Sequence, residues 1–105
     1  MPIDGHPPML TRTFVVDGVE VGCSFFQPEL DRGDYCCTYE IAWPEGPRRR
    51  TIYGVDPIQA ALLAMQTAHV DLLVARKDDG RDVRWLDGRR LGLPIQDSLK
   101  DLDVD

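Results

Sequence analysis

The residues of this sequence best suited to chemistry are its three cysteines and two histidines. Cys23 and Cys37 fall at inward positions of predicted strands, where we expect buried, reduced thiols that lie opposite each other if the connection between the two strands is symmetric. Cys36 points the other way and could act as a nucleophile or redox thiol. Its sequence neighbourhood offers no cation or helix start that would lower the pKa of the thiol. We therefore predict no catalytic cysteine, and we assign no catalytic role to any other residue.

His69 lies within the apolar stripe of a predicted helix. A histidine in that setting is most often a core residue with one hydrogen-bonded ring nitrogen. The functional interpretation makes it the polar anchor of a ligand pocket between helix and sheet, lined also by Tyr39, Trp43 and Trp85. His6 is far away near the N-terminus, and no H-x-x-x-H or C-x-x-C spacing is present. We therefore predict no metal site and no cofactor.

Arginines are concentrated at positions 48–50 and 89–90. One interpretation is a solvated sheet edge whose charge prevents strand-to-strand aggregation. A second is that these guanidinium groups bind carboxylates, either of the protein's own acidic tail or of a partner. A predicted interaction surface combines these arginines with apolar residues on a second side of the helix: Arg48, Arg49, Arg50, Leu63, Val70 and Val74.

The net charge of the chain and the absence of common catalytic and nucleotide-binding motifs make several classes of function less favoured. The 105 residues carry 18 acidic and 12 basic side chains, a net charge of -6. This charge repels phosphate, so we predict no nucleic-acid partner and no membrane partner, and we expect charged partners to be basic. No phosphate-binding loop, dinucleotide fingerprint or nucleophile elbow is present, so an enzyme is the less favoured interpretation. The start of the chain does not resemble a signal sequence, and we expect a cytoplasmic protein with reduced thiols.

The strands that would position these residues follow from alternating apolar and polar positions. Two runs, 14–16 and 19–21, flank Asp17-Gly18, a dipeptide typical of tight hairpin turns. A fourth strand, rich in charge, is predicted at 48–53. The third strand places large side chains on a single inner face: Tyr35, Cys37, Tyr39, Ile41 and Trp43.

A long amphipathic helix follows the strands. Asp56 is the predicted N-cap, Pro57 takes the first helical position, and Gln59 completes a capping box. We expect no membrane span, because polar residues interrupt the helix: Gln66, Thr67, His69 and Asp71. The stripe expected to face the sheet contains Ile58, Leu62, Met65, Leu72 and Leu73.

These elements predict an α+β fold, with an antiparallel sheet of about four to five strands and one long amphipathic helix packed on one face. A short strand near 83–86 is expected after the helix. We predict a flexible arm at residues 1–9, a single domain at 10–95 and an acidic C-terminal tail at 96–105.

Several segments carry a resemblance to a known family. They read GVDPIQAALLAM at 54–65, WLDG at 85–88 and LGLP at 91–94. Two strand-like segments precede them, VG at 21–22 and DYCCTY at 34–39. Across residues 19–95 the chain resembles a bacterial family of small stand-alone α+β proteins classed only as a domain of unknown function. The resemblance implies the same fold and brings no activity or site residue.

Three functional hypotheses remain, and the third, a purely structural role within a larger complex, is not separated by the sequence from the first. The favoured one is a non-enzymatic protein-interaction domain, either a homodimer or an acidic binder of a basic protein, as small immunity proteins are. The alternative is a small-molecule-binding protein or enzyme with a pocket near His69.

Overall fold

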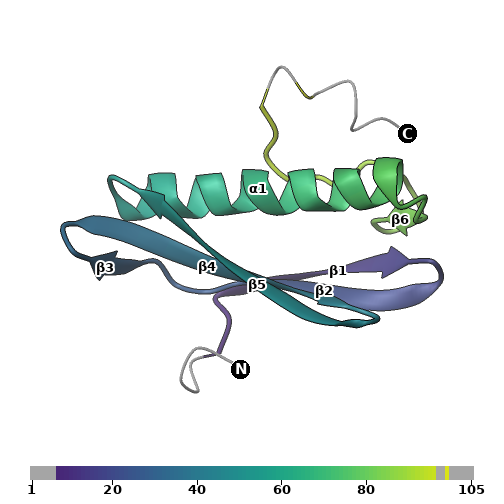
Figure 1. Ribbon diagram of the computed structural model, residues 1–105, viewed down its shortest axis with the longest axis horizontal. Helices are drawn as coiled ribbons and strands as arrows, with labels where there is room; N and C mark the ends of the chain where they lie inside the picture. The colour runs from purple at the N-terminus through teal and green to yellow at the C-terminus, as the bar shows by residue number, and fades with distance from the viewer. Residues whose placement is uncertain (1–6, 97–98, 100–105) are drawn as a thin grey trace.

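A computed structural model describes residues 7–96 and residue 99. Its helix, α1, lies along one face of a curved sheet, and no described helix covers the opposite face (Figure 1). The elements are β1 (Leu10–Val16), β2 (Val19–Phe25), β3 (Glu29–Asp31), β4 (Asp34–Trp43), β5 (Gly46–Gly54), α1 (Pro57–Asp78) and β6 (Val83–Arg84). The predicted α+β class, with one helix on an antiparallel sheet, is confirmed.

All strand pairs are antiparallel. β5 pairs along the whole length of β4, so β2 and β3 must share the other edge of β4. β2 also pairs with β1, which in turn pairs with β6. The sheet therefore runs β5-β4-β2-β1-β6 in space, with β3 extending the line of β2 along β4. The sheet has six strands rather than four to five, because the residues between β2 and β4 contain a further short strand, β3.

Two tight turns shape this sheet. Asp17 and Gly18 have φ values of 51° and 82°, and Arg32 and Gly33 have φ values of 56° and 90°. Consecutive left-handed residues of this kind match the twist of antiparallel strands. The first turn confirms the predicted hairpin, and the second joins β3 to β4.

The predicted pairing of Cys23 with Cys37 is wrong. β3 lengthens the connection between β2 and β4, so Cys23 lies opposite Ile41. Both thiols are fully buried, as predicted. The Cys37 thiol donates to the backbone oxygen of Phe26 at 3.3 Å, which places it beside the break between β2 and β3.

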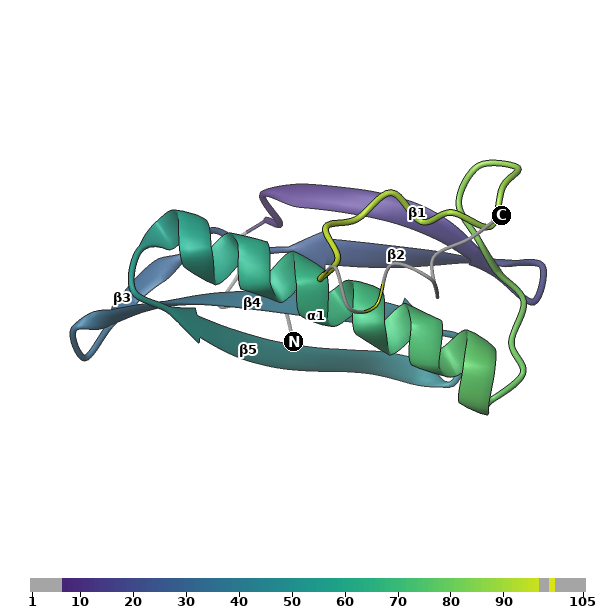
Figure 2. The ribbon, with the colours of Figure 1, turned by 90° about the horizontal axis from the view of Figure 1, so that it is seen from above.

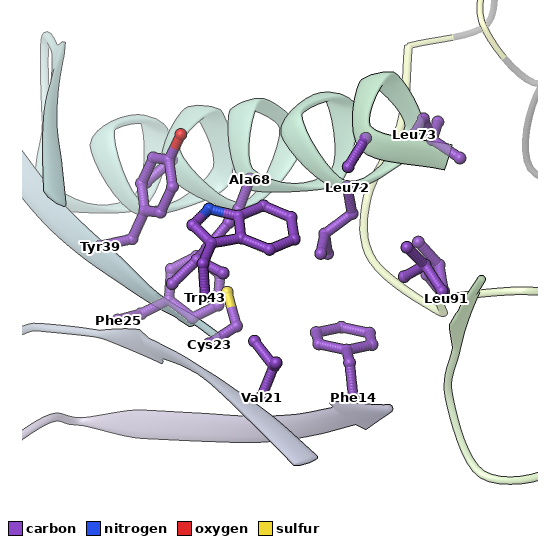
Figure 3. Close-up of a cluster of buried hydrophobic side chains, with 14 of the residues drawn as sticks. Phe14, Val21, Cys23, Phe25, Tyr39, Trp43, Ala68, Leu72, Leu73 and Leu91 are labelled. Carbon is purple, nitrogen blue, oxygen red and sulfur yellow. The ribbon is translucent and has the colours of Figure 1, made fainter. Parts of the chain in front are cut away.

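The core lies between the inner face of the sheet and α1 (Figure 3). The alternation predicted for the third strand is confirmed, since four of its five inward side chains are buried: Cys37, Tyr39, Ile41 and Trp43. β1 and β2 contribute Phe14, Val16, Val21, Cys23 and Phe25. The aromatic residues therefore come mostly from the strands, while the helix contributes smaller side chains.

α1 begins as predicted. The Asp56 carboxylate accepts a hydrogen bond from the Gln59 backbone N–H at 2.7 Å, and the Gln59 side chain accepts from the Val55 N–H at 2.8 Å. Pro57 takes the first helical position. The predicted Asp56 cap is therefore confirmed, whereas the Gln59 side chain bonds the N–H of the residue before the N-cap rather than that of Asp56, as a strict capping box requires.

The face of α1 predicted to contact the sheet is wrong at its N-terminal end. Ile58 is 78% exposed and Leu62 is 43% exposed. The buried residues are instead Ala60, Ala64, Ala68, His69, Leu72, Leu73 and Ala75. The physical reason is that the backbone of α1 comes very close to the backbone of β5 at this end. A Cβ atom on Gly54 of β5 would lie 2.5 Å from the Ala60 nitrogen, so this end of the helix rests almost directly on strand backbone.

α1 also corrects the expectation about membrane spans. By length and apolar composition alone, its 22 residues could cross a membrane, so the polar interruptions do not exclude a span. In the structure, its buried side chains pack in the core against the sheet.

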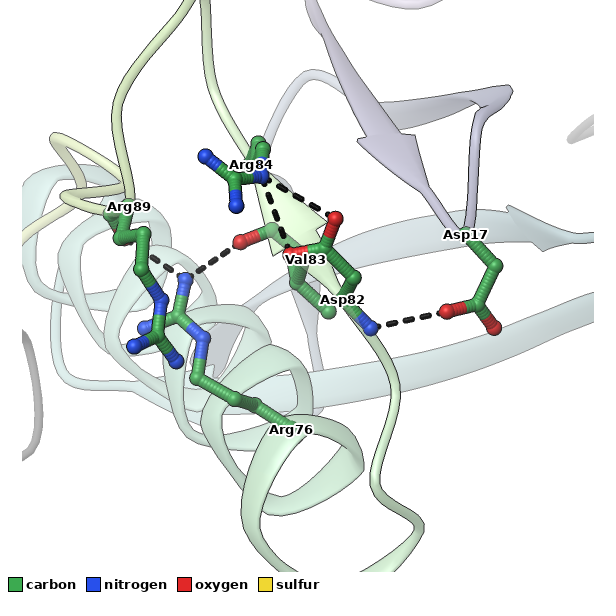
Figure 4. Close-up of polar contacts among 6 residues, drawn as sticks. All are labelled: Asp17, Arg76, Asp82, Val83, Arg84 and Arg89. Atoms are coloured by element: carbon green, nitrogen blue, oxygen red, sulfur yellow. Dashed lines mark hydrogen bonds and ion pairs between the residues drawn. The ribbon is translucent and has the colours of Figure 1, made fainter.

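The segment after α1 is held by side chains that reach its backbone oxygens. Arg76 donates to the oxygens of Val83 and Arg89 at 2.5 and 2.6 Å, and the Asp17 carboxylate accepts from the Asp82 N–H (Figure 4). Further along, Arg12 donates to the oxygens of Leu91 and Gly92. Figure 2 shows this segment passing over β1 and turning towards the outer side of α1.

Candidate functional site: an arginine-lined pocket

A pocket of about 210 Å³ lies between the C-terminal half of α1 and strands β4 and β5. Its walls combine aromatic and charged side chains. Two aromatic residues, three arginines and three acidic residues are among those that line it: Tyr39, Trp43, Arg48, Arg50, Arg81, Glu45, Asp71 and Asp79.

Strand register explains how the pocket forms. On the inner face, Tyr39 lies opposite Arg50, and Ile41 lies opposite Arg48. Trp43 lies opposite Gly46, which has no side chain to fill the space beside the indole ring. Alternation along β5 therefore turns Arg48 and Arg50 towards the helix and Arg49 away from it.

One end of the pocket is a hydrogen-bonded cluster around Asp71 of α1. The Tyr39 hydroxyl donates to one carboxylate oxygen, and Arg50 donates to the other at 2.9 Å. Burial, and then the neighbouring Asp71, raises the pKa of Tyr39 above its ordinary value of 10.0. Tyr39 is thus a neutral donor, and both oxygens of Asp71 have protein partners.

The other end is formed by Arg81, which follows the helix. Its guanidinium lies 4.9 Å from the centre of the Trp43 ring and pairs with Glu45 at 2.6 Å. The hydrogen bond from Arg81 lowers the pKa of the Glu45 carboxyl. Arg81 therefore covers the indole while its charge is balanced by the β4–β5 turn.

Arg48 is the exception among the three arginines. It is exposed, and it makes no hydrogen bond or ion pair with any residue that the structure describes. It lies on β5 between the two paired arginines, on the same side of the strand as Arg50. The pocket can thus offer one unengaged guanidinium to a ligand.

The structure brings together two of the four residues predicted to bind a ligand. Tyr39 and Trp43 line this pocket. His69 is fully buried on another flank of α1, where its Nδ1 lies 3.1 Å from the Pro94 oxygen. Trp85 lies under Arg12, 3.8 Å from the guanidinium carbon to the ring centre. His69 and Trp85 line none of the three described pockets.

The predicted interaction surface is divided among three places. Arg48, Arg50 and Val74 line the arginine pocket. Leu63 and Val70 line a neighbouring depression together with Leu99 of the C-terminal segment. Arg49 lies on the opposite face of the sheet, paired with Glu40 at 2.8 Å and 5.8 Å from the centre of the Phe26 ring.

The sequence does not predict four charged residues of the pocket: Glu45, Asp71, Asp79 and Arg81. Asp71 stands out in the sequence only as an interruption of the apolar helix, although a carboxylate there needs hydrogen-bond donors, which Tyr39 and Arg50 supply. Glu45 lies in the turn before β5, and Asp79 and Arg81 follow the helix, where the sequence shows no periodic pattern. These residues meet only because α1 crosses over β5, so the position of Asp71 within an apolar helix is the one usable signal.

The remaining candidates do not form a reactive centre. Cys36 lies on the face opposite α1, across from Tyr53, and its pKa is raised by desolvation and by Asp31 and Glu29. A raised pKa disfavours the reactive thiolate. Within residues 7–96 and 99, no group of three or more His, Cys, Asp or Glu side chains could hold a metal ion.

Comparisons with known proteins identify the family of this chain and assign it no activity. Neither the comparison with curated proteins nor the comparison with solved structures found a match. A family model matches from Leu10 to Ile95, which begins earlier than the expected resemblance over 19–95 and includes all of β1. On this match, the chain belongs to the family described as a domain of unknown function, DUF6968.

Proposed function

We propose that this domain is a non-enzymatic binding protein whose arginine-lined pocket holds a carboxylate-bearing segment of a partner protein. The observation that carries the proposal is the unengaged guanidinium of Arg48 at the pocket rim. Its neighbours Arg50 and Arg81 each pair with a carboxylate of the protein, Asp71 and Glu45. A ligand carboxylate would give Arg48 the same kind of partner.

The other groups of the pocket support a peptide ligand over a simple anion. The Trp43 ring and the Val74 side chain provide apolar contact area beside the arginine. Asp79, the C-cap residue of α1, adds an acceptor to the same rim. A segment that carries a carboxylate, an apolar group and a backbone N–H could satisfy all three, whereas a small anion uses only Arg48.

The state of the titratable groups supports binding rather than catalysis. Tyr39 is held in its neutral form, and Asp71 accepts from both Tyr39 and Arg50. Neither group is available to take a proton from a ligand without first losing these bonds. The described lining of the pocket includes no cysteine or histidine.

The proposal is tested by calorimetric titration of the full chain with the peptide acetyl-Glu-Glu-Glu-Glu-amide at low ionic strength. We expect binding that weakens about tenfold in Arg48→Gln, the loss of one charge-assisted hydrogen bond. Arg32→Gln is the matched control, because its side chain is 96% exposed on the β3–β4 turn. Equal weakening in both variants would show a general charge effect and contradict the site. Acetate that bound as tightly as the peptide would contradict the peptide ligand.

A further inference from the structure

We infer that the partner's acidic segment binds as an added β-strand, antiparallel to β5 along its free edge, with carboxylates at alternate positions on the side that faces α1. This inference rests on the proposed function of the pocket. It deepens that function by giving the partner segment a conformation, a direction and a spacing of its acidic residues.

The outer edge of β5 is open in the part of the chain that the structure describes. β5 pairs with β4 from Gly46 to Gly54 and with no other described strand. Figure 2 shows β5 along one border of the sheet, with no further described strand beside it. An edge of this kind offers unpaired backbone N–H and C=O groups, to which an extended peptide can add as a further strand.

One hydrogen bond determines which backbone groups of β4 point towards β5. Phe26 continues the register of β2 with β4 and lies opposite Thr38. Its N–H donates to the Thr38 oxygen at 2.9 Å. Because bonding directions alternate along an antiparallel strand, Thr38 points its backbone groups towards β2 and Tyr39 points its groups towards β5.

The open edge therefore belongs to Arg49 and Thr51. Arg50 lies opposite Tyr39, so its backbone groups point towards β4 and those of Arg49 and Thr51 point away from it. Among the described residues, no backbone hydrogen bond joins these outward groups to another segment. Pro47 has the same outward orientation, where its missing N–H leaves the pairing with β4 intact, as is typical of edge strands.

The same alternation places Arg48 and Arg50 where they can meet the side chains of an added strand. Both turn their side chains towards the helix and their backbone groups towards β4. In an antiparallel pair, the residues opposite them would form the non-hydrogen-bonded pairs, whose Cα atoms lie only about 4.5 Å apart. Carboxylates at every second residue would thus meet first Arg48 and then Arg50, which keeps donors beyond the one bonded to Asp71.

Charge favours an acidic partner over a second copy of this chain. β5 carries three arginines and no acidic residue, although the chain as a whole has a net charge of -6. Two β5 edges would place like charges opposite each other, which is destabilising, whereas an acidic strand places opposite charges there. The antiparallel direction follows the rest of the sheet and is the more stable pairing per residue.

The test titrates the full chain with three forms of the peptide acetyl-Val-Glu-Val-Glu-Val-amide, followed by NMR. In the inferred register the glutamates lie opposite Arg48 and Arg50, and the central valine N–H donates to the Arg49 oxygen. N-methylation of that valine should weaken binding about tenfold. N-methylation of the second glutamate, whose N–H points away from β5, is the matched control and should leave the affinity nearly unchanged. Equal effects, or a larger effect at the glutamate, would overturn the inference.

Hydrogen exchange supplies a second measurement. The amides of Arg49 and Thr51 should exchange rapidly in the free protein and about tenfold more slowly when about nine-tenths of the protein is bound. Amides that exchange slowly in the free protein in a concentration-dependent way would place a second copy on the edge and overturn the inference.

The variant Arg48→Gln separates this inference from the proposed function. Binding that weakens in Arg48→Gln, yet responds equally to both methyl groups, would uphold the carboxylate site and refute the added strand. Failure of the unmodified peptide to bind at all would refute both.

Discussion

Arg48 differs from the arginines around it in its surroundings rather than in its type. Arg50 is opposite Tyr39 and within reach of Asp71, and Arg81 meets Glu45 and the Trp43 ring. Arg48 lies opposite Ile41, a buried apolar residue that offers no acceptor. At the scale of single residues, the proposed function therefore depends on which guanidinium the fold leaves without a hydrogen-bonded carboxylate.

The buried thiols make a prediction about pH. Burial raises the pKa of Cys23 to about 12 and that of Cys37 to about 11, from an ordinary value of 9.0. Above about pH 9 the unfolded chain releases thiol protons that the folded protein keeps. The free energy of unfolding should therefore fall as pH rises, by up to about 1.4 kcal/mol per pH unit for each thiol. Tyr39, whose pKa is also raised, adds to the fall above about pH 10.

This fall can be measured by urea unfolding under reducing conditions from about pH 8 to about pH 10.5. The variant Cys23→Ala should be less stable throughout. Its free energy of unfolding should decline less steeply with pH, because the unfolded chain has one thiol proton fewer to release. A decline as steep as that of wild type would contradict the burial of the Cys23 thiol.

At the scale of elements, the contact between α1 and β5 determines which face of the helix is buried and where Asp71 lies. Gly54 and Ala60 allow backbone to approach backbone, and the alanines at positions 64 and 68 continue the contact. The close approach turns Ile58 and Leu62 outwards. It also brings Asp71, further along the same helix, to Tyr39 and Arg50.

The substitution Gly54→Ala tests this contact. Its Cβ would lie 2.5 Å from a backbone nitrogen, so helix and strand must separate, and we expect a loss of about 1–3 kcal/mol in the free energy of unfolding. Gly22→Ala is the matched control, since its Cβ would meet only Thr11 at 3.8 Å. Urea unfolding of both variants gives the comparison. Equal stabilities would contradict the close approach.

The elements differ in how far sequence could predict them. The inner faces of β2 and β4 followed from alternation, and the β1–β2 turn followed from Asp17-Gly18, because local chemistry determines both. β3 was missed because Glu-Leu-Asp lacks a strand pattern at three residues. The helix face was misassigned because apolar periodicity favours Ile58 and Leu62 over alanines, whose burial depends on a glycine in another element.

At the scale of the whole molecule, α1 and the chain that follows it cover one face of the sheet (Figures 1 and 2). The pocket lies at the β5 edge of that face. Composition predicted the arginine edge, and strand alternation placed Tyr39 and Trp43 on its inner side. The partners Asp71 and Arg81 could not be predicted, because they reach the pocket only through the crossing of α1 over β5. His69, which the sequence groups with these aromatics, lies on another flank of α1 and lines none of the three described pockets.

The most direct test of the central claim is an NMR titration of the full chain with the tetraglutamate peptide. It would follow the indole N–H of Trp43 and the Nε–H of Arg48. Both signals should move together and saturate, because the claim places the ligand carboxylate on Arg48 beside the Trp43 ring. The indole of Trp85, which lies under Arg12, should stay in place. Saturable binding that leaves Arg48 and Trp43 unmoved would contradict the claim.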